Sequence, residues 1–326
     1  MIALTSSLPV VLIALMFTAI GMAISTALMV GLAVQQGRQD GNIREYFAVQ
    51  EFFYYGANIL AAAGGGALCQ YLLPQNALNT AAAIAVLPVL CVAFLTAFAL
   101  KEAKAAVSRK AVVATAIYLR RGFQSPFLRI ALAFSMLWCF CPAMGVPLYF
   151  FESNTLNFTQ SEIGQLAAYN SVGMLFGTLF YRLAVKSLSM RWQLLSTIAI
   201  ACLSTLGYFW ISSFASAVAL ELLRGTANII VILTLYCLAA DFCPPRVEVS
   251  VMALLVAFRN IATDASTFVG GQLFSNVFHN ELRPLVFVSL IAPILSTVLV
   301  PIFFIALRKR DEKKDEKETN RAQKRG

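Results

Sequence analysis

ALNTAAAIAVLPVLCVAFLTAFAL, residues 77–100, is an apolar stretch without a single charged side chain. A helix needs about 20 such residues to cross the hydrocarbon core of a bilayer, so this stretch is long enough. Comparable apolar runs recur along the chain, and they do not show the alternation typical of membrane β-barrel strands. Because backbone groups inside a bilayer must be satisfied within the span, the runs predict transmembrane helices.

The overall composition supports the same class. Of the 326 residues, 59% are hydrophobic and 13% are charged, whereas a soluble domain has about 45–50% and about 25%. We therefore expect an all-α, multi-pass membrane protein with the bilayer as its surroundings. Nine spans are predicted, at 7–34, 47–72, 77–100, 127–151, 162–185, 191–212, 216–241, 248–277 and 283–307.

Basic residues indicate the orientation of these spans. Most of the 25 Lys and Arg residues fall in the connections 35–46, 101–129, 182–192 and 242–248 and in the tail after residue 307. By the positive-inside rule, these segments and the C-terminus are cytoplasmic. The tail, 308–326, is a charged low-complexity run and is expected to be disordered. No nucleic-acid partner is expected, because the basic residues lie in loops and not on a soluble face.

The basic loop 101–126 divides the predicted spans into a partial bundle (1–100) and a six-helix bundle (127–307). Two six-span halves joined by a basic cytoplasmic loop form the plan of the major facilitators. The chain fits that plan if its first three spans are missing, which gives an incomplete twelve-helix bundle. One helical face in the second and eighth spans carries polar or small residues with the same spacing, as equivalent helices would: Glu51, Tyr54, Tyr55, Asn58 and Ala62, against Asn260, Thr263, Asp264, Thr267 and Gly271.

Two longer stretches carry a more specific resemblance. LYFFESNTLNFTQSEIGQLAAYNSVGMLFGTLFYRLAVKSLSMRWQLL (148–195) and AADFCPPRVEVSVMALLVAFRNIATDASTFVGGQLF (239–274) are similar to the folate–biopterin transporter family of the major facilitator superfamily. The matching positions in the second stretch are Cys243, Pro244, Glu248, Ala253, Leu254, Leu255 and Asn260. The resemblance implies secondary active transport, by alternating access, of a small polar organic solute that is folate- or pteridine-like.

Charged residues at membrane depth are costly and usually face a cavity or a partner. Glu221, Arg224 and Asn228 share one face of the seventh span, which in the facilitator plan lines the central cavity. We interpret this face as substrate-binding. The alternative is a Glu221–Arg224 ion pair on one helix that only supports packing.

The eighth span carries Arg259, Asn260 and Asp264. Arg259 is expected either to bind an anionic solute or to extend toward the cytoplasmic interface. Asn260 and Asp264 share a face, and Asp264 is a candidate for carrying a coupling proton, since burial favours a neutral carboxyl group. The alternative for Asp264 is a structural counter-ion for Arg224 or Arg259. An Arg224–Asp264 contact between the two spans is predicted from their depths.

Arg182, Lys186 and Arg191 form a basic turn that resembles the cytoplasmic gating loop of facilitators, and topology alone is its other explanation. The single histidine disfavours a histidine-based metal site or catalytic relay, and neither metal nor cofactor is expected. Transport is the predicted function, with no enzymatic activity. A non-transporting membrane subunit, a membrane-embedded enzyme and an inactive truncated transporter are the alternatives.

Overall fold

The computed structural model describes residues 8–72, 74–99, 117, 126–242 and 248–323, and its regular elements are all helical. Apart from Ile117 and Pro126, the basic loop 101–126 lies outside these residues, and so do Cys243 and Pro244. The α-helices are α1 (Leu8–Gln39), α2 (Ile43–Tyr71), α3 (Pro74–Ala99), α5 (Pro126–Cys139), α6 (Val146–Phe150), α7 (Gln160–Leu183), α8 (Met190–Gly207), α9 (Phe214–Phe242), α10 (Glu248–Gln272) and α11 (Leu282–Gln323). Short π-helical turns follow α6 and α10, at η2 (Phe151–Thr155) and η5 (Leu273–Val277), and 3-10 turns are η3 (Val185–Ser187) and η4 (Tyr208–Trp210).

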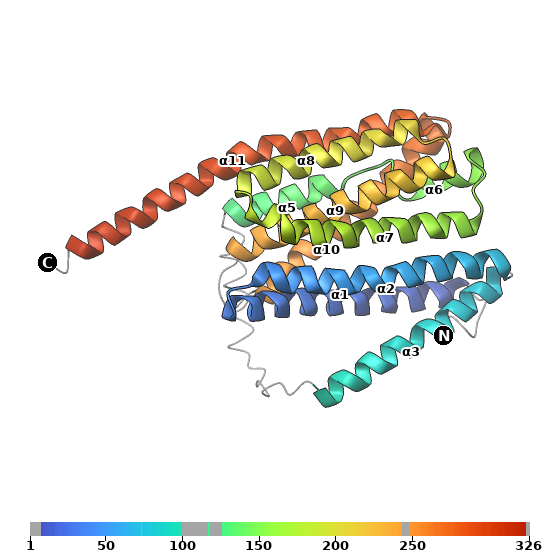
Figure 1. Cartoon of the computed structure of the whole chain (residues 1–326), viewed down its shortest axis with the longest axis horizontal. Coiled ribbons are helices and arrows are strands. Elements are labelled where there is room, and N and C mark those ends of the chain that lie inside the picture. The colour runs from blue at the N-terminus through green and yellow to red at the C-terminus, as the bar shows by residue number, and fades with distance from the viewer. Residues whose placement is uncertain (1–7, 73, 100–116, 118–125, 243–247, 324–326) are drawn as a thin grey trace.

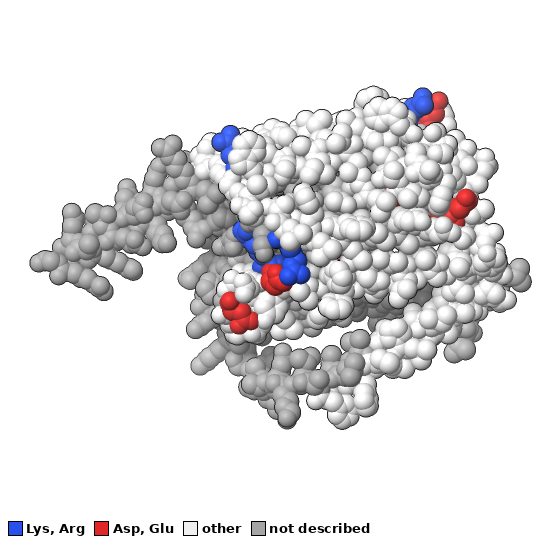
Figure 2. Space-filling view, viewed as in Figure 1, with Lys and Arg blue, Asp and Glu red and all other residues white. Residues whose placement is uncertain are grey.

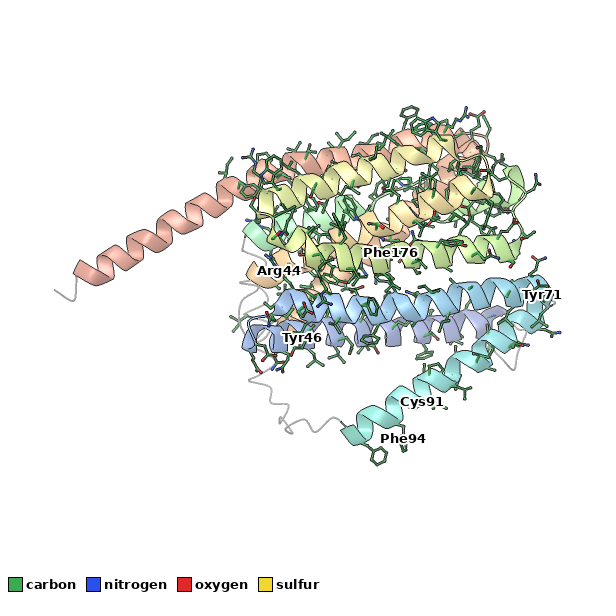
Figure 3. The ribbon with its side chains drawn as sticks, in the orientation of Figure 1. Arg44, Tyr46, Tyr71, Cys91, Phe94 and Phe176 are labelled. Carbon is green, nitrogen blue, oxygen red and sulfur yellow. The ribbon has the colours of Figure 1, made fainter. Side chains whose placement is uncertain are left out.

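The long helices lie side by side in one bundle (Figure 1). α1 and α2 form a pair that packs against α7, α9 and α10, while α3 diverges from the bundle beyond its contact with α2. The tail end of the bundle is the end at which α1 turns into α2 and the helix α11 leaves it. The opposite end is the far end. α2 runs from one end to the other, with Tyr46 near the tail end and Tyr71 at the far end (Figure 3).

The helices have the character of membrane spans. Among the described residues, four helical stretches are long and apolar enough to cross a bilayer: Leu12–Gly37, Arg191–Trp210, Phe214–Ala240 and Leu282–Ile305. On the face shown in Figure 2, the described charged side chains gather toward the two ends of the bundle and leave the flank between them free of described charged side chains. The all-α membrane fold is confirmed by these features, whereas the count of nine spans stays a prediction.

The predicted fourth span, 127–151, is broken rather than continuous. α5 ends at Cys139 and α6 begins at Val146, with an irregular segment between them. Pro142 within this segment and Gly145 at the start of α6, with a φ of 75°, both favour an interruption. Ser289 of α11 accepts a hydrogen bond from the backbone N–H of Ala143 at 2.7 Å, so one backbone group freed by the break is satisfied.

Small residues let the helices approach closely, as is common in membranes. Gly173 and Gly225 lie where α7 crosses α9, and Gly66 of α2 faces Gly164 of α7. A Cβ added at Gly164 would lie 2.6 Å from the Cα of Gly66. α7 itself begins with a capping box, in which Thr159 and Glu162 satisfy each other's backbone N–H groups. These contacts fix α7 between the α1–α2 pair and α9.

Near the tail end, an apolar cluster joins the α1–α2 pair to the other helices. Val30 and Val34 of α1 and Phe47 of α2 are buried with Tyr236 of α9 and Met252 of α10. The rings of Phe47 and Tyr236 lie 5.3 Å apart. Contacts between apolar side chains of the α1–α2 pair and those of α9 and α10 therefore hold the pair against the other helices.

The charged tail differs from its prediction. Residues 308–323 continue α11 as helix, where the composition predicted disorder. The tail is rich in Glu, Lys and Arg, which all favour helix, and charges of opposite sign recur three positions apart. A low-complexity composition therefore excluded a packed core but did not exclude a single extended helix, which leaves the bundle in Figure 1.

Neighbouring glycines on α10 provide a test of this packing. A Cβ at Gly270 would clash with the carbonyl oxygen of Pro142 in the helix break, whereas a Cβ at Gly271 meets no atom within 4 Å. We expect Gly270→Ala to destabilise the folded protein by at least about 1–3 kcal/mol, the usual cost of overpacking. Gly271→Ala is the matched control and should melt like the wild type. Thermal unfolding of both variants in detergent measures the difference, and equal melting temperatures would contradict the close approach.

Candidate functional site

A cavity of about 1660 Å³ lies among α1, α2, the helix break and α7–α11. Arg224, Asn228 and Tyr236 of α9 line it, together with Arg259 and Asn260 of α10. The opposite wall comes from α1 and α2 and includes Ser25, Thr26, Gln50, Glu51, Tyr54, Tyr55 and Asn58. Parts of the polar faces predicted on the second, seventh and eighth spans therefore line one space, although Glu221 and Asp264 are not part of its lining.

Arg224 and Glu221 form an ion pair within α9. Nε and Nη2 of Arg224 donate to Oε2 of Glu221 at 3.1 Å and 2.6 Å. The hydroxyl of Tyr208 donates to the other carboxylate oxygen at 2.5 Å. Glu221 is 3% exposed and lies behind the cavity wall, whereas 32% of the Arg224 side chain is exposed and lines the cavity. The carboxylate thus holds the guanidinium at the cavity surface.

Arg259 forms a second cationic group in the same cavity. Its Nη1 donates to the hydroxyl of Tyr236 at 3.1 Å, and its guanidinium carbon lies 5.9 Å from the centre of that ring. Tyr236 is 2% exposed and belongs to the neighbouring helix α9. The ring therefore positions Arg259 by a hydrogen bond and a cation–π contact while its guanidinium lines the cavity.

Glu51 of α2 faces this second cluster from the other wall. It is 7% exposed and interacts electrostatically with Arg259 and Tyr55. One carboxylate from α2 therefore balances one guanidinium from α10 across the cavity. The sequence showed Glu51 on a polar face with Tyr55, but it could not show which cation faces that carboxylate.

Glu152 is a functional candidate that sequence reasoning missed. It lies in the π-helical turn η2 at the far end, is 5% exposed, and interacts electrostatically with Arg224 and Glu221. A glutamate directly after an apolar run usually marks the membrane surface, and the predicted fourth span ended at residue 151. The π-helical turn, which often occurs at functional sites, places its side chain inside the bundle.

The remaining predicted site residues divide into two groups. Asn228 and Asn260 line the cavity, and so do two residues at the helix break that were not predicted site residues, Cys139 and Cys141. Asp264 is exposed and is not part of the cavity lining. The predicted partner of Arg224 was wrong: Arg224 pairs with Glu221. The depth of a residue along its span does not determine the direction in which its side chain points, and the i, i+3 carboxylate was the nearer anion.

The basic turn after α7 lies at the tail end. Arg182 forms an ion pair with Glu45 of α2, and both side chains are about 40% exposed. Such an exposed pair contributes about 0–1 kcal/mol, so it connects the two helices without strongly stabilising them. Lys186 lies in η3, where the structure describes its backbone, and Arg191 is exposed at the start of α8. A gating role for this turn stays a prediction.

The arrangement presents two guanidinium groups, aromatic rings and amides to one cavity. Guanidinium groups suit carboxylates and phosphates, because their N–H groups form paired charge-assisted hydrogen bonds. Tyr54 and Tyr55 provide aromatic surface on the α2 wall. Their rings pack edge to face, with ring centres 5.0 Å apart. Within the described ranges, no group of three or more His, Cys, Asp or Glu side chains is arranged to hold a metal ion.

Comparison with known proteins identifies the family. The chain matches the BT1 family over residues 1–325. It is also 23% identical, over 277 residues, to a folate–biopterin transporter from Synechocystis sp.. That match covers 79% of this chain and 54% of the relative, so the chain spans about half the length of that protein.

Solved structures show the same fold. A bacterial homologue of the iron transporter ferroportin, in its inward-facing state, superposes with a TM-score of 0.55 at 17% identity, covering 79% of this chain and 63% of that one. A bacterial metal transporter superposes with a TM-score of 0.51 at 18% identity, covering 82% and 66%. At this identity the likeness concerns the fold alone. The resemblance found in the sequence is confirmed: the chain belongs to the BT1 family and has the fold of a membrane transporter of the major facilitator type.

Proposed function

We propose that the protein is a secondary transporter that carries a small anionic organic solute by alternating access. The solute binds in the central cavity, where Arg224 and Arg259 contact its negative groups and Asn228 and Asn260 donate or accept further hydrogen bonds. The presence of two arginines in one cavity at membrane depth is the observation that carries this proposal. Charged groups in such positions are expensive and mark substrate pathways.

Position and chemistry both support the proposal. The cavity lies between the α1–α2 pair and the helices α7–α11, as expected when a site lies between two parts that rock against each other. The helix break beside it is also typical of secondary transporters, whose sites contain interrupted helices. The relative's name, folate–biopterin transporter, suggests the solute class. Folate carries carboxylates and a planar ring, which match the arginines and the tyrosines.

The test is uptake of labelled solute by vesicles that contain the full-length protein. We expect saturable uptake of folate, with competition by other anions that carry a planar ring. An uncharged pterin, such as biopterin, should compete at least tenfold less well, because it lacks the carboxylates. Empty vesicles provide the control. Absence of saturable uptake for folate, biopterin and a broader panel of organic anions would contradict the transport function.

The orientation of the protein in the membrane is part of the proposal. With the basic connections and the tail placed in the cytoplasm, the far end of the bundle lies outside, and a coupling proton enters or leaves through the same cavity. The asymmetric distribution of Lys and Arg supports this orientation. A reporter fused after Lys314 should give a cytoplasmic signal, and an external signal would reverse the assignment.

A further inference from the structure

The Arg224 cluster contains more negative than positive side chains. Glu221 already accepts two N–H groups from Arg224 and one O–H group from Tyr208. Glu152 is 5% exposed, and in the described part of the chain its carboxylate makes no hydrogen bond or ion pair. Three titratable or charged side chains interact with it electrostatically: Glu221 and Arg224 from α9 and Tyr208 from η4.

The balance of charge distinguishes Glu152 from the other acidic candidates. At the second cluster, Glu51 is matched by Arg259, one carboxylate to one guanidinium. Asp264 is exposed and outside the cavity lining, so it does not depend on a partner there. Glu152 and Glu221 share a single guanidinium, that of Arg224, and this guanidinium is already hydrogen-bonded to Glu221. A buried carboxylate without compensation is costly to ionise, and binding a proton removes that cost.

We propose that Glu152 carries the coupling proton of the transport cycle, with Arg224 linking it to the solute site. This inference rests on the proposed function and assigns its coupling residue. Glu152 binds one H⁺ to become neutral in one state of the cycle and releases the same H⁺ when its surroundings change. No other bond forms or breaks.

The link to the solute follows from the position of Arg224. Its guanidinium contacts Glu221 on one side and lines the cavity on the other. An anion bound there engages the one cation of the cluster and adds negative charge, so the proton on Glu152 is held more strongly. By thermodynamic reciprocity, a protonated Glu152 strengthens the binding of the anion to the same degree. Solute and proton therefore bind together, as coupled transport in one direction requires.

Two assays on vesicles with full-length protein separate coupling from binding. In the first, labelled folate exchanges for unlabelled folate without a pH difference. In the second, a pH difference of one unit is imposed across the membrane. Coupling to one proton allows the wild type up to about tenfold accumulation. Glu152→Gln imitates the neutral carboxyl, so we expect exchange within about threefold of the wild type and accumulation that no longer responds to the pH difference.

Two variants complete the design. Glu281→Gln, an exposed change at the same end of the bundle, and Asp264→Asn, at the carboxylate that the sequence favoured, should both keep accumulation driven by the pH difference. The proposal would be overturned if Glu152→Gln still accumulated folate in response to the pH difference. It would also be overturned if that variant lost both exchange and accumulation. If Asp264→Asn alone lost the accumulation driven by the pH difference, Asp264 would be the proton carrier instead. If the wild type itself exchanges no folate or biopterin, the proposed function fails first.

Discussion

Arg224→Gln is expected to abolish folate uptake and also to destabilise the protein. The substitution removes the guanidinium from the cavity wall and leaves Glu221, which is 3% exposed, with Tyr208 as its remaining hydrogen-bond donor among the contacts described. Breaking a buried ion pair by removing one partner costs roughly 3–5 kcal/mol. Uptake normalised to inserted protein and thermal unfolding in detergent measure the two effects separately.

The double variant Glu221→Gln/Arg224→Gln separates folding from function. Without the buried charge, its stability should recover to within about 1–2 kcal/mol of the wild type, because replacing both partners of a pair costs much less than removing one. Uptake should stay absent, since the cavity still lacks its guanidinium. Recovery of uptake in the double variant would reduce the Glu221–Arg224 pair to a packing role, which was the alternative explanation for these residues.

Arg259→Gln gives the second large effect, a loss of affinity for the solute together with a smaller loss of stability than in Arg224→Gln. Arg259 donates to the neutral Tyr236 hydroxyl and forms no direct ion pair among the described contacts, but its removal leaves the buried Glu51 without the guanidinium that balances its charge. A hydrogen bond to a charged group is worth about 1.5–3 kcal/mol, which corresponds to about a 10- to 150-fold loss of affinity for the solute. The apparent KM for folate should rise by this factor.

Arg191→Gln is the matched control for Arg259→Gln. It also removes one positive charge, but from an exposed position at the start of α8 rather than from the cavity. Its KM should stay within about twofold of the wild type, because a distant exposed charge is screened by salt. If both variants raised the KM equally, overall charge rather than contact at the site would explain the effect.

The sequence predicted most of the fold, because the bilayer constrains length and polarity so strongly. The predicted spans 162–185 and 216–241 correspond to α7 (Gln160–Leu183) and α9 (Phe214–Phe242) within two residues. The break after Cys139 was missed because apolar residues continue through it, although Pro142 is a signal in retrospect. The helix in the tail was missed because its charged, low-complexity composition predicted disorder.

The site was predictable where it depends on the spacing along one helix. Glu221 and Arg224 lie three positions apart, and their ion pair follows from that spacing. Contacts between helices depend on rotation and packing, which a single sequence does not contain. The Arg259–Tyr236 hydrogen bond joins α10 to α9, and Glu152 approaches Arg224 from the π-helical turn η2. These contacts therefore became visible only in three dimensions.

The most direct test of whether the two arginines bind an anionic solute is an uptake measurement in vesicles. It compares folate with biopterin, and wild-type protein with the double variant Arg224→Gln/Arg259→Gln. The account predicts that the double variant loses folate uptake by at least about 100-fold, since two charge-assisted contacts are removed. Uptake of uncharged biopterin, if the wild type carries it, should fall at least tenfold less than uptake of folate. Folate uptake at the wild-type rate in the double variant would contradict the account.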